Sequence, residues 1–272
     1  MKLIDALFLK QPWLITPEAH AAMVGAAQTF FQTPPDALPE APQSPLLSVE
    51  DGVGIVSIEG PFLRKPDLIS RLIFGATDTE EIIAAVQEAG ARDDVQAIFL
   101  DIDSPGSSTN GTPELAQAVA DAAKDKYVYA YSGGLMCSGA YWVASQCDAI
   151  YVTPSARVGS IGVILPVRDV SEALHKDGIR VEVFAAGKYK SAGIPGVPLT
   201  DDQRALLQAG VEEVAAEFHA AVLARGRRIP PEAMEGQTFS ARAAMKMNLA
   251  GTVKSRAHAL RMLRERHVKA TA

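Results

Sequence analysis

The sequence has few cysteines, no excess of positive charge and no long apolar run. Two cysteines in 272 residues, Cys137 and Cys147, are too few for a disulfide framework and make no metal site. The formal net charge of −6 and the pI near 5.4 argue against a nucleic-acid surface, which needs a basic face. No run approaches the ~18 apolar residues of a membrane span. We therefore expect no nucleic-acid partner, no membrane span and, without His, Cys, Asp and Glu at ligand spacing, no metal or other cofactor.

Histidine, the usual base that activates a serine, is poorly placed in this chain. His20 precedes a proline-rich break, His175 and His219 fall in helical patterns, and His258 and His267 lie in a basic tail. A serine nucleophile here therefore needs another base.

The chain does have enough apolar residues for a sizeable core. It is 48% hydrophobic and 21% charged, as expected of one large α/β domain, alone or with appendages. Strand-like and helix-like segments alternate, which predicts a largely parallel sheet with helical crossovers. We expect strands at residues 53–59, 97–101, 127–131, 149–152 and 181–184, and helices at 79–89, 113–123, 169–176 and 200–225, with a further helix after Ser138.

The pattern divides the chain into four parts. Residues 1–32 are expected to form an N-terminal helical arm, in which Thr16 caps a helix that starts at Pro17. Residues 33–48 form a proline-rich linker, residues 49–253 the main domain and residues 254–272 a basic helix or tail. The arm either folds back on its own domain or reaches a neighbour. Within the domain, residues 64–74 are expected to cover a substrate groove or to contact another subunit.

Three segments together supply a nucleophile and a base. In residues 137–145, Ser138 stands among small residues before an apolar run, as in a strand-to-helix turn that exposes a hydroxyl. Ser160 lies in residues 159–163, and two lysines lie in residues 187–191. Lysine replaces histidine as the base in the serine–lysine variant of the catalytic triad. Cys137, beside the serine, is expected to be a small buried residue.

A lysine base must be neutral for part of the time. Its free pKa is about 10.4, so operation near pH 7 needs a depression of roughly three units, or about 4 kcal/mol. Burial among apolar groups supplies such a depression. Lys190 lies between the apolar run 181–186 and the uncharged stretch 191–199, which favours a dry setting. Lys188 faces the same side of an extended segment, so periodicity alone does not choose between the two lysines.

A glycine-containing turn follows the expected strand at residues 97–101. It reads Ser104-Pro105-Gly106-Ser107. Backbone N–H groups of such a turn can donate to the oxyanion of an acyl-transfer intermediate. The alternative is a plain Ser-Pro-Gly β-turn.

In this order and spacing, the segments resemble the signal peptide peptidase A family of serine–lysine proteases, and most closely its phage branch, the capsid or prohead proteases. The likeness covers about residues 53–253. It implies a ClpP/crotonase-like stack of strand–strand–helix units. It also implies a role for each residue at the site: Ser138 as the nucleophile, Lys190 rather than Lys188 as the general base, Ser160 as the partner that orients the lysine, and the amides of Ser107 and Gly139 as oxyanion donors.

The chain departs from the family pattern in two places. The family's second glycine in the Ser-Pro-Gly-Gly turn is Ser107 here, so a side chain narrows the site. Residues 248–252 replace a Gly-Leu-(Val/Ala)-Asp segment, and this difference concerns packing rather than chemistry.

The resemblance implies a serine endopeptidase that forms an acyl-enzyme on flexible polypeptide during phage head maturation. Its substrates would be capsid or scaffold proteins, its subunits would form a homo-oligomer, and it would work in the host cytoplasm or the assembling head. Three alternatives remain open at this point. They are a bacterial signal peptide peptidase-like protease without its anchor that degrades released peptides, a crotonase-like acyl-CoA enzyme, and a non-enzymatic assembly protein.

Overall fold

The computed structural model describes residues 12–30 and 45–268. Residues 33–44 of the expected linker lie outside these ranges. The strands are β1 (Trp13–Ile15), β2 (Leu47–Glu50), β3 (Val53–Glu59), β4 (Phe62–Leu63), β5 (Thr77–Asp78), β6 (Ala97–Asp103), β7 (Gly106–Ser108), β8 (Tyr127–Ser132), β9 (Leu135–Cys137), β10 (Ala149–Val152), β11 (Arg157–Gly159), β12 (Thr238–Ser240) and β13 (Gly251–Thr252).

The helices begin with α2, which carries the predicted cap: Thr16 Oγ1 accepts from the Ala19 amide at 3.2 Å.

None of the helices in the described ranges combines the length and apolar character that a membrane span requires. They are α2 (Pro17–Phe30), α3 (Leu68–Phe74), α4 (Thr79–Ala91), α5 (Thr112–Asp125), α6 (Gly139–Ser145), α7 (Ser171–Lys176), α8 (Asp201–Leu223), α9 (Ala241–Lys246) and α10 (Arg256–His267), with a 3₁₀ turn at Pro231–Ala233.

The main sheet has the strand order β13-β10-β8-β6-β3-β2 and is parallel except for β2 at one edge. Because side chains alternate along a strand, each strand feeds two separate cores. Residues such as Ile55, Phe99 and Tyr131 pack with Leu260 and Leu263 of α10, while Val56 and Leu100 join the larger core on the opposite face. The sheet is therefore apolar on both faces.

A strand–strand–helix unit repeats along the chain. The successive units are β3-β4-α4, β6-β7-α5 and β8-β9-α6. The first strand of each unit enters the main sheet, and the second strands enter two small sheets, β1-β7-β4-β5 and β12-β11-β9. The expected fold class, α/β with a largely parallel sheet and stacked strand–strand–helix units, is confirmed.

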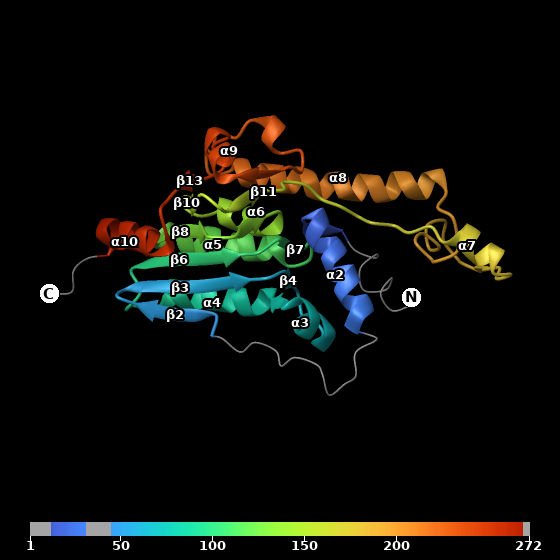
Figure 1. Cartoon of the computed structure of the whole chain (residues 1–272), viewed down its shortest axis with the longest axis horizontal. Coiled ribbons are helices and arrows are strands. Elements are labelled where there is room, and N and C mark those ends of the chain that lie inside the picture. The colour runs from blue at the N-terminus through green and yellow to red at the C-terminus, as the bar shows by residue number, and fades with distance from the viewer. Residues whose placement is uncertain (1–11, 31–44, 269–272) are drawn as a thin grey trace.

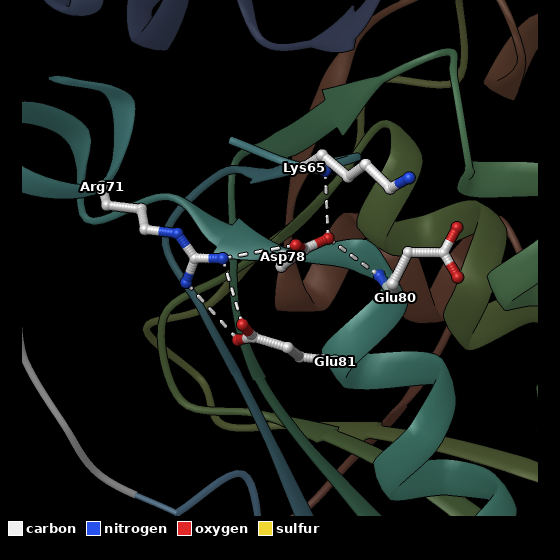
Figure 2. A network of polar contacts seen from close by, with 5 residues as sticks. All are labelled: Lys65, Arg71, Asp78, Glu80 and Glu81. Atoms are coloured by element: carbon white, nitrogen blue, oxygen red, sulfur yellow. Dashed lines mark hydrogen bonds and ion pairs between the residues drawn. The ribbon is translucent and has the colours of Figure 1, made fainter. Parts of the chain in front are cut away.

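A polar network fixes the start of α4 (Figure 2). Asp78 Oδ1 accepts from the amides of Lys65 and Glu80, both at 3.0 Å, and the other carboxylate oxygen pairs with Arg71 at 3.2 Å. Asp78 is thus the N-cap of α4. Glu81, three residues later, where a capping box would place a side chain reaching back to the cap, instead forms an ion pair with Arg71 of α3 at 3.0 Å. The network consequently ties α3 to α4.

One expectation about local structure is wrong. Residues 181–184 form no strand: they pair with no neighbour in the described part of the chain, and Phe184 is 94% exposed. A run of β-branched and aromatic residues needs a partner strand, and none lies beside this one. Residues 64–74 hold helix α3, with an N-cap at Asp67 that accepts from the Ser70 amide at 2.7 Å.

Helix α8 joins the body at its C-terminal part and extends beyond the sheet together with α7 (Figure 1). It begins with the predicted capping box between Thr200 and Gln203. Near its other end, Phe218 is fully buried and stacks on Trp142 of α6 with ring centroids 4.8 Å apart. This stack holds α8 against α6.

Replacing Phe218 with alanine should lower the free energy of unfolding by about 3–5 kcal/mol, because it leaves a cavity beside Trp142. Urea denaturation measures this change. Leu223→Ala is the matched control on the same helix; Leu223 is 40% exposed, so its loss should cost about 0.5 kcal/mol or less. Equal losses from the two changes would show that the stack does not anchor α8.

Candidate active site

Ser138 joins β9 to α6 in a strained conformation. Its φ of 54° and ψ of −122° lie outside the regions that L-residues favour, at a cost of about 1–3 kcal/mol. Its hydroxyl is fully buried and has no hydrogen-bond partner among the described residues. A buried, unpartnered hydroxyl is itself unfavourable. Both costs fall on the serine that the sequence predicts as the nucleophile.

Ser160 occupies the corresponding position after the neighbouring strand. β9 and β11 run parallel with Cys137 opposite Gly159, and the Ser138 amide donates to the Gly159 carbonyl at 2.7 Å. Ser160 also has a positive φ, of 52°, and its amide donates to the Gln237 carbonyl at 2.6 Å. The structure therefore brings the two predicted serines to adjacent strand ends.

The Ser-Pro-Gly turn lies against the same strand. The Ser104 amide donates to the Leu135 carbonyl at 2.8 Å, and the Cys137 amide donates to the Ser104 carbonyl at 3.2 Å. A β-carbon on Gly139 would overlap Ser107 Oγ. The two residues expected to hold an oxyanion are thus in direct contact, and the amide of Gly139 has no acceptor within its helix because it is the first helical residue.

The Ser107 side chain has a partner that sequence reasoning missed. Ser107 Oγ and Thr112 Oγ1 lie 2.7 Å apart, and Thr112 Oγ1 donates to the Ser108 carbonyl at 2.7 Å. A hydroxyl has one proton, so the proton between the two side chains belongs to Ser107. The extra side chain is therefore held by Thr112. The spacing of five residues gave no signal of this contact.

The structure does not bring Lys190 to Ser138. Its side chain is exposed, and the Ser138 hydroxyl has no hydrogen-bond partner in the described ranges. Lys190 lines a pocket of about 620 Å³ together with Pro12 and Leu165. The dry setting expected for Lys190 is thus not seen, because none of the described elements covers residues 182–190.

Lys188 is engaged elsewhere. Its ammonium forms an ion pair with Asp202 at the start of α8. The hydrogen bond that Lys188 donates to Asp202, and then the nearby Tyr189, raise the pKa of Lys188 above its ordinary value. A general base near neutral pH needs the opposite shift. Lys188 in this setting is therefore unsuited to be the base.

Cys137 is buried beside Ser138, and burial raises the pKa of its thiol to about 12. Burial also raises the pKa of Cys147 to about 12. Only the thiolate is nucleophilic, so neither cysteine can replace the serine near neutral pH.

Both thiols should resist a disulfide reagent in the folded protein at about pH 8, since the raised pKa leaves them protonated and burial blocks access. Both should react once concentrated urea unfolds the chain. Ellman's assay before and after unfolding measures this. Rapid modification of Cys137 in the native state would contradict the assigned burial.

A short strand, which sequence analysis also missed, covers the site. β1 pairs antiparallel with β7, with Leu14 opposite Ser107, and Leu14 is fully buried. Only three residues separate the flanking Pro12 and Thr16, too few for a periodic pattern to stand out.

Gly139→Ala should lower the free energy of unfolding by about 1–3 kcal/mol, because the added methyl overlaps Ser107 Oγ. Gly90→Ala is the control: the nearest atom to its added methyl is Ala122 Cβ at 3.8 Å, and alanine is the better helix former, so stability should rise by up to about 1 kcal/mol. Thermal unfolding of both variants gives the comparison. If Gly139→Ala left the free energy of unfolding unchanged, Ser107 would not be held against α6.

Comparisons with known proteins agree with the resemblance drawn from the sequence. Capsid assembly protease C of Escherichia phage lambda is 30% identical over 170 residues, which are 62% of this chain and 38% of that protein. Head-tail preconnector protein GP5 of Enterobacteria phage P21 is 30% identical over 145 residues, 53% of this chain and 29% of that one. Protease 4 of Salmonella typhi is 28% identical over 153 residues, which are 54% of this chain and 24% of that protein. The chain thus spans less than half the length of these relatives.

Among solved structures, an enoyl-CoA hydratase/isomerase from Marinobacter aquaeolei has a TM-score of 0.44 at 14% identity, covering 80% of this chain and 74% of that one. An enoyl-CoA hydratase from Thermoplasma volcanium has a TM-score of 0.42 at 15% identity, with coverages of 83% and 79%. The family model for peptidase family S49 matches residues 120–270. This match covers more than half of the sequence and includes Ser138, Ser160 and Lys190, and the chain therefore belongs to peptidase family S49.

Proposed function

We propose that the protein is a serine endopeptidase that uses Ser138 and Lys190 through an acyl-enzyme. The observation that carries the proposal is the Ser138 hydroxyl, which is buried, lacks a partner and sits on a strained turn beside Ser107 and Gly139. A protein gains no stability from such a group, so a chemical role accounts for its cost.

In the proposed reaction, neutral Lys190 takes the proton of Ser138 as the serine oxygen attacks the scissile carbonyl. The amides of Ser107 and Gly139 hold the oxyanion that forms. Lys190 then protonates the leaving amine, which separates and leaves the acyl group on Ser138. A water, deprotonated by Lys190, attacks the acyl carbonyl; the Ser138 oxygen leaves and takes that proton from Lys190, which restores both groups. Ser160 orients the lysine.

Lys190 is favoured over Lys188 for two reasons. Lys188 is bound to Asp202, whose carboxylate keeps it charged. Lys190 has no ion pair in the described part of the chain and lines the pocket next to Pro12, the residue that precedes β1.

The proposed dyad requires Lys190 to approach Ser138. Its segment forms no regular element between α7 and α8, and most of its side chains are exposed. The approach occurs either when this segment folds over its own site or when the same segment of a second copy supplies the amine. The second route makes the expected homo-oligomer part of the active site.

The biological role that we propose is cleavage of capsid or scaffold proteins during phage head maturation, in the host cytoplasm or inside the assembling head. Two relatives support it by name: one is a capsid assembly protease and the other a head-tail preconnector protein, both from phages. Incubation with purified phage capsid and scaffold proteins tests this role: cleavage that is lost in Ser138→Ala supports it, and no cleavage of either protein contradicts it.

A fluorophosphonate probe should label the wild-type protein at Ser138 and should not label Ser138→Ala. Mass spectrometry of the labelled peptide identifies the site. Ser145→Ala is the matched control, since Ser145 is a buried serine of the same helix whose hydroxyl donates to the Trp142 carbonyl at 2.6 Å. Label that persists in Ser138→Ala would exclude this serine as the nucleophile.

Lys190→Ala should lower peptide turnover by about 10²–10⁴-fold, the usual contribution of a general base, whereas Lys188→Ala should keep most of the rate. Mixed oligomers of Ser138→Ala and Lys190→Ala then separate the two routes. Recovered turnover means that the amine comes from a neighbouring copy, and no recovery means that it comes from the same chain. Equal losses in Lys188→Ala and Lys190→Ala would reject the lysine assignment.

A further inference from the structure

β1 lies between two backbone edges beside Ser138. On one side, Trp13 exchanges both of its backbone hydrogen bonds with Ile164: its amide donates at 2.7 Å and its carbonyl accepts at 3.0 Å. Ile164 lies four residues beyond Ser160, in the segment that follows β11. This edge therefore continues from the strand end that carries one of the site serines.

The other edge is β7, and it bonds the alternate residues. The Thr16 amide donates to the Pro105 carbonyl at 3.1 Å, and the Thr109 amide donates to the Pro12 carbonyl at 3.3 Å. Leu14 stands directly opposite Ser107 in this antiparallel register. β1 is thus bonded on both edges, which is how an extended segment is held when it inserts between two strands.

Leu14 is the residue of β1 that reaches the reactive centre. A β-carbon on Gly139 would lie 3.3 Å from Leu14 Cβ, and one on Gly106 would overlap the Leu14 carbonyl oxygen. The side chain of Leu14 is fully buried in the main core, beside the residue that follows Ser138. Its carbonyl lies against the Gly106–Ser107 backbone, where the proposed oxyanion donor is found.

The neighbouring side chains of β1 point to a different cluster. Trp13 and Ile15 pack with Met23 and Ala27 of α2, and with Leu63 of β4. β1 and α2 therefore form one unit, anchored to the body by two backbone edges, by the Leu14 side chain and by the apolar contact with Leu63.

From these contacts we infer that β1 is a removable occupant of the peptide-binding groove, and that a substrate strand binds only after β1 leaves. The inference rests on the proposed function of Ser138. The groove takes an extended polypeptide that is bonded on both edges, with a leucine-sized apolar residue at the position of Leu14. While β1 is in place, Ser138 and Ser107 are fully buried and no substrate reaches them.

Leu14→Asp tests the inference, because a carboxylate is disfavoured in the apolar site that Leu14 fills. Two readouts are used: the rate of fluorophosphonate labelling, and the binding of a fluorescein-labelled peptide with the sequence of residues 11–16, followed by anisotropy. Both should rise at least tenfold relative to wild type. The same peptide with aspartate in place of its leucine is the control and should not bind.

A reversible lock keeps the test decisive if Leu14→Asp does not fold. Trp13 and Ser108 are direct partners across β1 and β7, and the backbone bonds of Trp13 go to Ile164, so the pair has the close spacing that suits a disulfide. In the double variant Trp13→Cys/Ser108→Cys, reduction should increase labelling and peptide binding at least tenfold over the oxidised form.

The two readouts separate the inference from the function on which it rests. One outcome is that peptide binding tightens in the variants while the probe labels neither the wild type nor any variant. It would support a peptide-binding groove under β1 and reject Ser138 as the nucleophile. Labelling that is unchanged by Leu14→Asp and by the lock, with no gain in peptide binding, would overturn the inference and make β1 a permanent strand of the sheet.

Discussion

The backbone hydrogen bonds of Ser104 set the geometry of the whole site. They tie the turn after β6 to β9, the strand that ends at Ser138. Because β6-β7-α5 and β8-β9-α6 are successive copies of one unit, the turn and Ser138 meet through the repeat of the fold and not through any single side chain. Side chains only complete the arrangement: Thr112 holds Ser107, and Gly139 leaves room for it.

Much of the fold could be predicted from local pattern. The bounds of β3 and β10 match the sequence prediction to the residue, because buried strands between turns carry a strong apolar signal. Residues 181–184 carry a similar signal and form no strand, since a strand exists only where a neighbour offers its edge, and that neighbour is not encoded locally. The prediction failed in the opposite way at β1. Its three residues are too few to show a periodic pattern, yet β7 on one edge and Ile164 on the other are present to pair with them.

In the candidate site too, some features follow from local sequence and others depend on tertiary contacts. Ser138, Ser160 and Ser107 are positioned by turns a few residues long, and the structure brings their backbones close together. The setting of Lys190 depends on what covers its segment, and no local pattern of apolar residues determines that. The same limit applies to Glu81, which pairs with Arg71 of another helix in preference to its own N-cap (Figure 2).

The stack of Phe218 on Trp142 gives α8 a mechanical role. Trp142 lies four residues after Ser138, on the helix that Ser138 precedes, while the outer turns of α8 stand clear of the sheet (Figure 1). The aromatic stack therefore couples the position of α8 to that of α6. A displacement of the far end of α8 would act, through this stack, on the turn that holds Ser138.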